Sequence, residues 1–161
     1  MPSADLSPTA IRLPRRVFVG AGLAWVGTSF AQNAPTPPSP ELLAATAAFA
    51  GGQPIRAGRV RIAVATLVDN GNTVPLALRV DSPMSAADHV TEIAVFNEKN
   101  PQRDVARFTL SPRNGRAEVA TRIRLATSQK LVALARMNDG SVWQDMVDVV
   151  VVLAACIEGE G

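Results

Sequence analysis

The chain has 161 residues, of which 47% are hydrophobic and 19% charged, and its formal net charge is +2. This length suits one domain with its own core, and the composition excludes a largely disordered chain. Five Phe and two Trp are the only aromatic residues besides one His, and Tyr is absent. The core must therefore be aliphatic, and a nucleic-acid platform of stacked aromatic rings is excluded.

The first 31 residues have the pattern of a twin-arginine export signal. Arg15 and Arg16 precede a short apolar run, residues 17–27, and Ser29-Phe30-Ala31 offers small residues at the two positions that a signal peptidase reads. The apolar run contains glycines and is shorter than the ~20 residues that a bilayer needs, which argues against a membrane anchor. We therefore expect residues 1–31 to be removed and the mature protein to be periplasmic.

Removal of this segment changes the charge balance. It takes away Arg12, Arg15 and Arg16 together with Asp5, so the mature chain is formally near neutral. The basic surplus of the whole chain is therefore not the footprint of a nucleic-acid or membrane partner.

The elements after the signal begin with a spacer and a helix. Residues 32–38 are proline-rich and predict a stiff spacer. Ser39-Pro40-Glu41 is a typical helix start, with an N-cap residue, a proline in the first turn and an early acid. Gly51-Gly52 marks the end of this helix.

Beyond Gly58 the apolar residues recur with a period of two, which is typical of strands with one solvent face. This period predicts strands near residues 60–64, 74–80, 93–96, 106–110, 117–125, 131–137 and 142–153. Turn signals separate them, among them Asp69-Asn70-Gly71-Asn72. Arg113-Asn114-Gly115-Arg116 is expected to form a hairpin turn.

Short strands at this spacing predict an all-β fold, an antiparallel sandwich over residues 39–153. A short helix precedes the sandwich, and an arm, residues 154–161, follows it. The last strand differs from the others because Val149–Leu153 is apolar without alternation. We expect both faces of this strand to be covered, either within the sandwich or by another subunit.

The arm carries Cys156, the only cysteine of the chain. A lone cysteine in an exported protein indicates an intermolecular disulfide or a reactive free thiol. A buried, inert cysteine is the common alternative, but Cys156 follows directly after a stiff strand and is hard to bury. The pattern predicts a thiol on a short arm that can enter the pocket of another protein.

The residues give little support for a metal site or a catalytic site. One Cys and one His cannot supply the ligands of a blue-copper or structural zinc site, so we expect no metal and no cofactor. A nucleophilic pair of Cys156 and His89 remains formally open, although an arm lacks the preorganised surroundings that catalysis needs. His89 is expected to be a loop histidine satisfied by a neighbour. Arg122 and Arg124 are expected on the wet face of a strand or at a partner interface.

Several segments, in the same order, resemble the SoxY family, the sulfur-carrier subunits of the periplasmic thiosulfate-oxidising Sox system. The likeness extends from the helix near Glu41 to Cys156. The matching segments are Asp69-Asn70-Gly71-Asn72-Thr73-Val74-Pro75, Val80-Asp81-Ser82-Pro83-Met84, Ala87-Asp88-His89-Val90, Val95-Phe96-Asn97-Glu98-Lys99-Asn100-Pro101 and Thr121-Arg122-Ile123-Arg124-Leu125-Ala126.

The resemblance implies an immunoglobulin-like sandwich that pairs with a SoxZ-like subunit as a heterodimer. It also implies that Cys156 carries thiosulfate as a Cys-S-thiosulfonate, followed by later sulfur intermediates. In that role the chain is not an enzyme. A haem c-type enzyme loads the thiol, a hydrolase releases sulfate, and a redox partner strips the remaining sulfane sulfur.

The tail departs from the family pattern, in which glycine pairs flank the cysteine. Here Ala154 and Ala155 precede Cys156, and Ile157, Glu158 and Gly159 follow it. The alanines give less freedom than glycines, so Gly159 is the remaining flexible position, and acidic residues repel an anionic cargo. The tail therefore predicts a slower or altered carrier, or a paralogue.

Two other readings stay open. The chain could be an interaction module whose tail has lost the cargo role. A periplasmic thiol reductant is disfavoured because the chain has no resolving cysteine.

Overall fold

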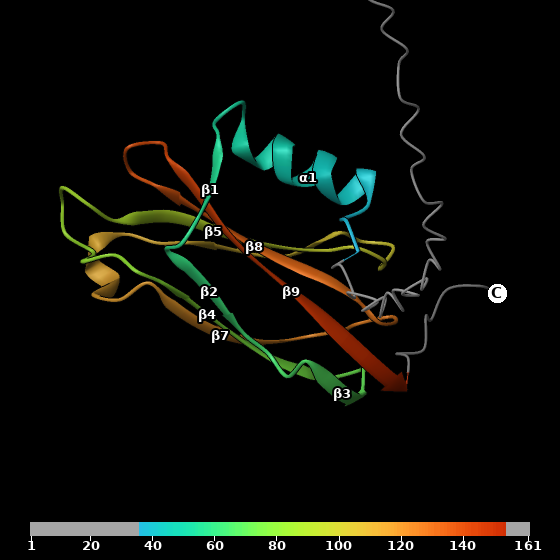
Figure 1. Ribbon diagram of the computed structural model, residues 1–161. Helices are drawn as coiled ribbons and strands as arrows, with labels where there is room; N and C mark the ends of the chain where they lie inside the picture. Colours follow the sequence, from blue (N-terminus) through green and yellow to red (C-terminus); the bar gives the residue numbers. More distant parts are fainter. Residues whose placement is uncertain (1–35, 154–161) are drawn as a thin grey trace, which may run out of the picture. The chain divides into compact units, whose positions relative to one another are not determined.

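The computed structural model describes residues 36–153 (Figure 1). The export signal, the start of the spacer and the arm with Ala154, Ala155, Cys156 and Gly159 lie outside the described residues. The described part consists of one α-helix, a short 3-10 helix and nine strands in two sheets. The elements are α1 (Pro40–Ala50), β1 (Ile55–Ala57), β2 (Val60–Ala63), β3 (Leu67–Asn70), β4 (Val74–Val80), β5 (Val90–Asn97), β6 (Asp104–Thr109), η1 (Pro112–Asn114), β7 (Glu118–Ile123), β8 (Gln129–Met137) and β9 (Val142–Leu153).

Helix α1 begins and ends where the sequence predicts. Ser39 has an extended backbone, and its Oγ accepts a hydrogen bond from the backbone N–H of Leu42 at 3.3 Å. Gly51 ends the helix with a φ of 60°, a left-handed conformation that glycine adopts easily. The backbone N–H of Glu41 and the hydroxyl of Ser39 bond to the Glu41 carboxylate and lower its pKa.

The smaller sheet has three antiparallel strands in the order β2-β4-β7. Burial alternates strictly along β4, which confirms the predicted period of two. Val74, Leu76, Leu78 and Val80 face the core, and the residues between them are exposed. One face of this sheet is therefore packed, and the other is open to solvent.

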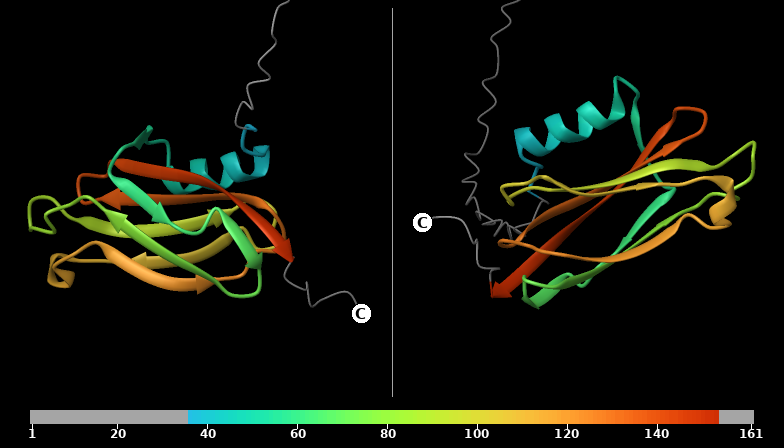
Figure 2. Two further views of the ribbon diagram at one scale, coloured as in Figure 1. Left: turned by 60° about the horizontal axis from the view of Figure 1, so that its bottom comes forward. Right: turned by 180° about the vertical axis from the view of Figure 1, so that it is seen from behind.

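The larger sheet has the order β1-β9-β8-β5-β6, and β3 also pairs with β9. Its two central strands, β5 and β8, are buried on both faces. Ile93, Val95, Leu131 and Ala133 face the smaller sheet, whereas Ala94, Phe96, Val132 and Leu134 pack against Leu42 and Phe49 of α1. The result is three layers, with α1 on one side of the larger sheet and the smaller sheet on the other (Figures 1 and 2).

Strand β9 is the longest and runs obliquely across the molecule (Figure 1). Two short strands that the sequence did not predict pair with it in parallel. β1 pairs with its beginning, Ile55 opposite Val142, and β3 pairs with its end, Leu67 opposite Val150. The described strands therefore form the expected sandwich, with these two parallel pairings as an addition to the antiparallel pattern.

The expected hairpin at residues 113–116 was wrong. This segment begins within η1 and contains Gly115, which has a φ of 69°. It connects β6 of the larger sheet to β7 of the smaller sheet, so the chain crosses between layers at this point. The Asn-Gly turn signal was correct, but the strands that flank it do not pair with each other.

Candidate functional site: the base of the arm

The end of β9 is the point from which the cysteine-bearing arm departs. Leu153 is the last residue of this strand, and Cys156 follows three residues later, outside the described residues. What the structure describes is therefore the base of the arm. Its surroundings fix the point at which the chain leaves the sandwich.

The end of β9 is held on both sides. On one side β3 runs parallel to it, and the backbone N–H of Gly71 donates a hydrogen bond to the carbonyl oxygen of Leu153 at 2.9 Å. On the other side Ser128 Oγ accepts a hydrogen bond from the backbone N–H of Val151 at 2.9 Å. A strand end is usually loose unless it is tied into a sheet. Here both edges are tied, so the arm starts from a fixed point.

Asn100 joins the loops that surround this point. Its side-chain Nδ2 donates to the carbonyl oxygen of Arg124 at 2.7 Å, and its Oδ1 accepts from the backbone N–H of Ala126 at 3.0 Å. Gln129 Nε2 donates to the same Oδ1 at 2.7 Å. The backbone N–H of Leu125 in turn donates to the carbonyl oxygen of Gly71 at 2.8 Å.

These bonds bring together three segments that lie far apart in the sequence. They are residues 69–75, 95–101 and 121–126, three of the five segments that carry the resemblance to SoxY. The resemblance therefore concentrates at the end of the sandwich from which the arm departs. Sequence reasoning found these segments but did not place them together.

Buried polar side chains support the same end of the fold. Asn97 and Gln129 are almost fully buried. Asn97 Nδ2 donates to the carbonyl oxygen of Gln102 at 3.1 Å, and Gln129 Oε1 accepts from the backbone N–H of Lys99 at 2.8 Å. Among the described residues no buried side-chain polar atom lacks a partner. A fully satisfied network of this kind fixes the loops rather than leaving them to move.

A buried lysine lies one strand away from the arm base. Lys130 of β8 stands opposite Asp148 of β9, and its Nζ lies 2.5 Å from Asp148 Oδ1. The Lys130 side chain is only 5% exposed, whereas that of Asp148 is 64% exposed. The pair therefore ties β9 to β8 five residues before the end of β9.

The outer face of β9 is not covered within the sandwich, which leaves coverage by another subunit as the alternative for this strand. Val149 is buried, but Val150 is 52% and Val152 61% exposed. Leu67 of β3 stands beside Val150 and is 61% exposed. The exposed Asp148 separates these residues from Met146 on the same face of β9. We call Leu67, Val150 and Val152 the apolar strip. Single exposed apolar residues are common, whereas adjoining ones can form an interaction surface.

His89 lies at the opposite end of the sandwich. Its Nδ1 is 3.0 Å from the carbonyl oxygen of Ser85, as expected for a loop histidine satisfied by a neighbour. The backbone N–H of His89 donates to Asn138 Oδ1 in the turn before β9. β9 spans about 36 Å from that turn to Leu153, and three residues of arm add at most ~10 Å. Cys156 cannot reach His89 within one chain, which removes the Cys–His pair.

The remaining sequence expectations concern Arg122, Arg124 and metal ligands. Both arginines are exposed, as predicted. Between residues 36 and 153 no group of three or more His, Asp or Glu side chains is placed to hold a metal ion. In the same range, the single α-helix does not have the length and apolar character needed to span a bilayer.

Comparison with known protein families gives a match over more than half of the chain. The family model described as sulfur oxidation protein SoxY matches residues 45–156, a range that ends on Cys156. The solved structure of the sulfur carrier protein SoxY from Chlorobium limicola f thiosulfatophilum is 29% identical. It has a TM-score of 0.58, and the match covers 68% of this chain and 94% of that one.

More distant matches share only the fold. Superoxide reductase (neelaredoxin) from Ignicoccus hospitalis is 19% identical, with a TM-score of 0.52 and coverage of 58% of this chain and 80% of that one. A putative superoxide reductase from Thermotoga maritima is 20% identical, with a TM-score of 0.50 and coverage of 64% and 89%. Among curated proteins there is no significant match. From the extent of the family match, the chain belongs to the SoxY family of sulfur oxidation proteins.

Proposed function

We propose that this protein is a periplasmic sulfur carrier that holds thiosulfate-derived sulfur on Cys156 and presents it to partner enzymes. The observation that carries the proposal is the anchored end of β9. The bonds from Gly71 to Leu153 and from Val151 to Ser128 fix the base of a short arm. That arm contains the only thiol of the chain, and the family match extends to it.

The chemistry proposed for Cys156 is covalent holding and not catalysis. In loading, the thiol and thiosulfate form Cys-S-S-SO3−, and one proton and two electrons leave. The electrons pass to a haem c-type enzyme. In the next step, water cleaves the terminal sulfur–sulfur bond on a hydrolase, which gives a Cys persulfide, sulfate and a proton. A redox partner then oxidises and removes the remaining sulfane sulfur.

The proposed role explains why the thiol lies on an arm. Several enzymes must reach the same sulfur in turn, and each encloses its reacting centre in a pocket. A thiol fixed on the sandwich surface would not enter such pockets. A segment a few residues long can enter, provided that its base is held so that the partners find it in a constant position.

We further propose that a SoxZ-like subunit covers the apolar strip. Leu67, Val150 and Val152 are each more than half exposed. Burial of such side chains supplies association energy at about 25 cal/mol per Å² of apolar surface. The strip adjoins the base of the arm, so the partner subunit would stand beside the thiol without blocking it.

An interaction module without cargo is the second candidate. It is favoured by Ala154, Ala155 and Ile157, which replace the glycines expected beside the cysteine. In that case the strip would still bind a subunit, but Cys156 would have no essential role.

Complementation of a host strain that lacks this gene separates the two candidates. We expect the wild-type protein to restore thiosulfate consumption and the Cys156→Ser variant not to restore it. Both proteins should bind the partner subunit equally. Equal thiosulfate consumption by Cys156→Ser would overturn the carrier function and leave the interaction module.

A further inference from the structure

The outer face of the smaller sheet is a surface to which the proposed function assigns no role. Ala63, Ala77 and Ala120 stand opposite one another on β2, β4 and β7, so their methyl groups form a row across all three strands. Arg61, Arg79 and Glu118 form the adjacent row on one side, also in register. On the other side Pro75 stands opposite Arg122. We call this surface the arginine–alanine groove.

The groove is hollowed because short side chains lie between long ones. Two shallow hollows meet at the alanine row, with volumes of about 630 and 420 Å³. Strands in a sheet are spaced about 4.8 Å apart, so the alanine row is about 10 Å wide across the three strands. Along the strands, Pro75 and Arg79 are four residues apart, about 13 Å, which is enough for a few residues of extended chain. A stable interface between folded proteins is larger and buries ~800 Å² on each partner.

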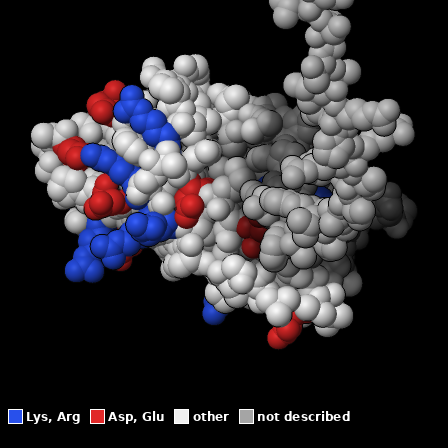
Figure 3. All heavy atoms as spheres, viewed as in Figure 1, with Lys and Arg blue, Asp and Glu red and all other residues white. Residues whose placement is uncertain are grey.

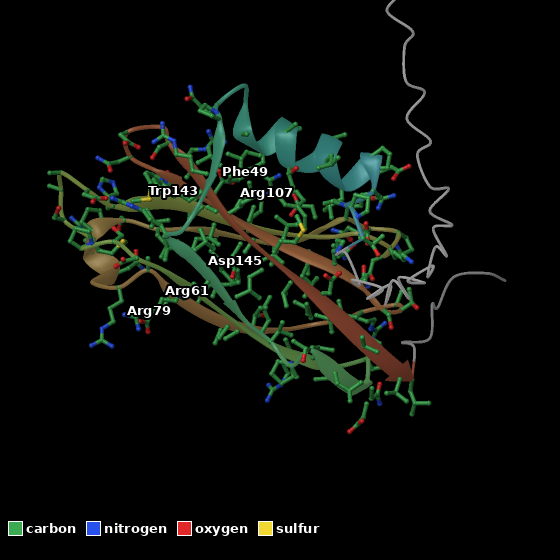
Figure 4. All side chains as sticks on the ribbon, in the orientation of Figure 1. Phe49, Arg61, Arg79, Arg107, Trp143 and Asp145 are labelled. Carbon is green, nitrogen blue, oxygen red and sulfur yellow. The ribbon has the colours of Figure 1, made fainter. Side chains whose placement is uncertain are left out.

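The groove is more basic than acidic. Its two hollows are lined by three arginines, Arg61, Arg79 and Arg122, and by one carboxylate, that of Glu118. Arg79 lies 3.4 Å from Glu118. Arg61 and Arg122 form no ion pair with any described residue. Arg61 and Arg79 lie at one end of the sandwich, where Lys and Arg atoms gather with Asp and Glu atoms among them (Figures 3 and 4).

We propose that the arginine–alanine groove binds the chain's own acidic segment, Ile157–Gly161. This segment contains Glu158 and Glu160 on either side of Gly159. The small Gly159 would cross the alanine row, while Glu158 pairs with Arg122 and Glu160 pairs with Arg61. Ile157 would contact the apolar part of the floor beside Pro75.

The lengths of chain are compatible with this docking. The bond between Gly71 and Leu153 places the end of β9 next to the beginning of β4. From Gly71, Pro75 lies four residues along the chain and Ala77 six, which is about 13 and 20 Å in a strand. From Leu153, Glu158 and Glu160 are five and seven residues away and reach up to ~17 and ~24 Å. The side chains of arginine and glutamate span the remaining distance.

The expected docking is weak and reversible. Exposed ion pairs contribute only about 0.2–1 kcal/mol each, but a short tether gives an effective concentration in the millimolar range. The docked state should therefore be populated at low salt and lost as the ionic strength rises. Docking would hold the arm along the sandwich, and an acidic surface of a partner would release it. This regulatory meaning rests on the proposed carrier function, whereas the docking itself does not.

NMR spectroscopy of the ¹⁵N-labelled mature chain, residues 32–161, tests the docking without thiosulfate. We compare the wild-type protein with a variant carrying Glu158→Gln and Glu160→Gln at low salt. We expect amide shifts to differ at Ala63, Ala77, Ala120 and Arg122, and the difference to vanish at about 0.5 M salt, where the Debye length is only a few Å. Arg122→Gln should remove the difference, and Arg113→Gln, an exposed arginine in η1, should preserve it.

One result would overturn the proposal. If the glutamine variant and the wild-type protein have identical spectra in the groove, the segment does not dock there. A separate glutamate-rich peptide is then added as a probe. Shifts at the same alanines with this peptide would assign the groove to an acidic segment of a partner instead, and no shifts would show that the groove binds neither. Neither result bears on loading of Cys156, which the complementation test addresses independently.

Discussion

The backbone N–H of Gly71 donates a hydrogen bond to the carbonyl oxygen of Leu153 at 2.9 Å, which joins the turn before β4 to the last residue of β9. These residues lie 82 positions apart in the chain, and their contact fixes the place from which the arm departs. Together with Ser128 on the other edge of the strand, it makes the base of the arm part of the sandwich. Cys156 therefore follows, three residues later, a strand end that is held on both edges.

Removal of the Ser128 hydroxyl should loosen the arm base. Ser128→Ala leaves the backbone N–H of Val151 without its 2.9 Å acceptor. We expect the free energy of unfolding to fall by about 0.5–1.5 kcal/mol. Hydrogen exchange should become faster at Val151 and stay unchanged at Val142, which serves as an internal control. If the exchange rate at Val151 is the same in the variant as in the wild-type protein, Ser128 does not anchor the strand.

The loss of stability on breaking the ion pair between Lys130 and Asp148 should depend strongly on which of the two residues is replaced. Asp148→Asn leaves a lysine that is 5% exposed without its carboxylate. We expect a loss of about 1–3 kcal/mol in the free energy of unfolding, measured by urea denaturation. Lys130→Met removes the buried charge itself and should be much less harmful. A larger loss for Lys130→Met than for Asp148→Asn would contradict this explanation.

The apolar strip should be required for binding the partner subunit and not for folding. Val150→Glu places a charge at a position that is 52% exposed in the single chain, so we expect little change in melting temperature. Affinity for the partner should fall about 10- to 100-fold, because burial of one valine is worth roughly 1.5–3 kcal/mol. Titration calorimetry measures this directly.

Leu43→Glu provides the matched control for the strip. Leu43 is 51% exposed on α1 and lies outside the strip, so its replacement should leave the affinity unchanged. Equal weakening by both substitutions would point to a general charge effect and not to a defined interface.

The altered tail should limit loading of Cys156. Replacement of both Ile157 and Glu158 by glycine restores backbone freedom and removes one negative charge next to the sulfur. We expect faster formation of the thiosulfate conjugate, followed by mass spectrometry after addition of thiosulfate and an oxidant. An unchanged yield and rate would show that these two residues are compatible with full carrier activity.

The sequence predicted the parts of the fold in which one face of a strand meets solvent. In β4, Val74, Leu76, Leu78 and Val80 alternate with exposed residues, so the period of two is visible. In β8 burial does not alternate, because α1 covers Val132 and Leu134 while the smaller sheet covers Leu131 and Ala133. That α1 forms the third layer could not be read from its own sequence.

The strands β1 and β3 were missed for a different reason. They have three and four residues, and both pair in parallel with β9, far along the chain. Such a short strand has no periodicity of its own, and its partner is decided by the length of β9. The segments that resemble SoxY were recognised, but only the bonds of Asn100 and Gly71 show that three of them meet at the arm base.

The carrier function is tested most directly by intact-mass spectrometry of the mature protein purified from its own periplasm during growth on thiosulfate. The spectrum is recorded with and without a reducing agent, and Cys156→Ser is processed in parallel. We predict a reducible adduct with the mass of thiosulfate or sulfane sulfur on the wild-type protein and none on the variant. A bare thiol, or only a disulfide-linked dimer through Cys156, would contradict the carrier function.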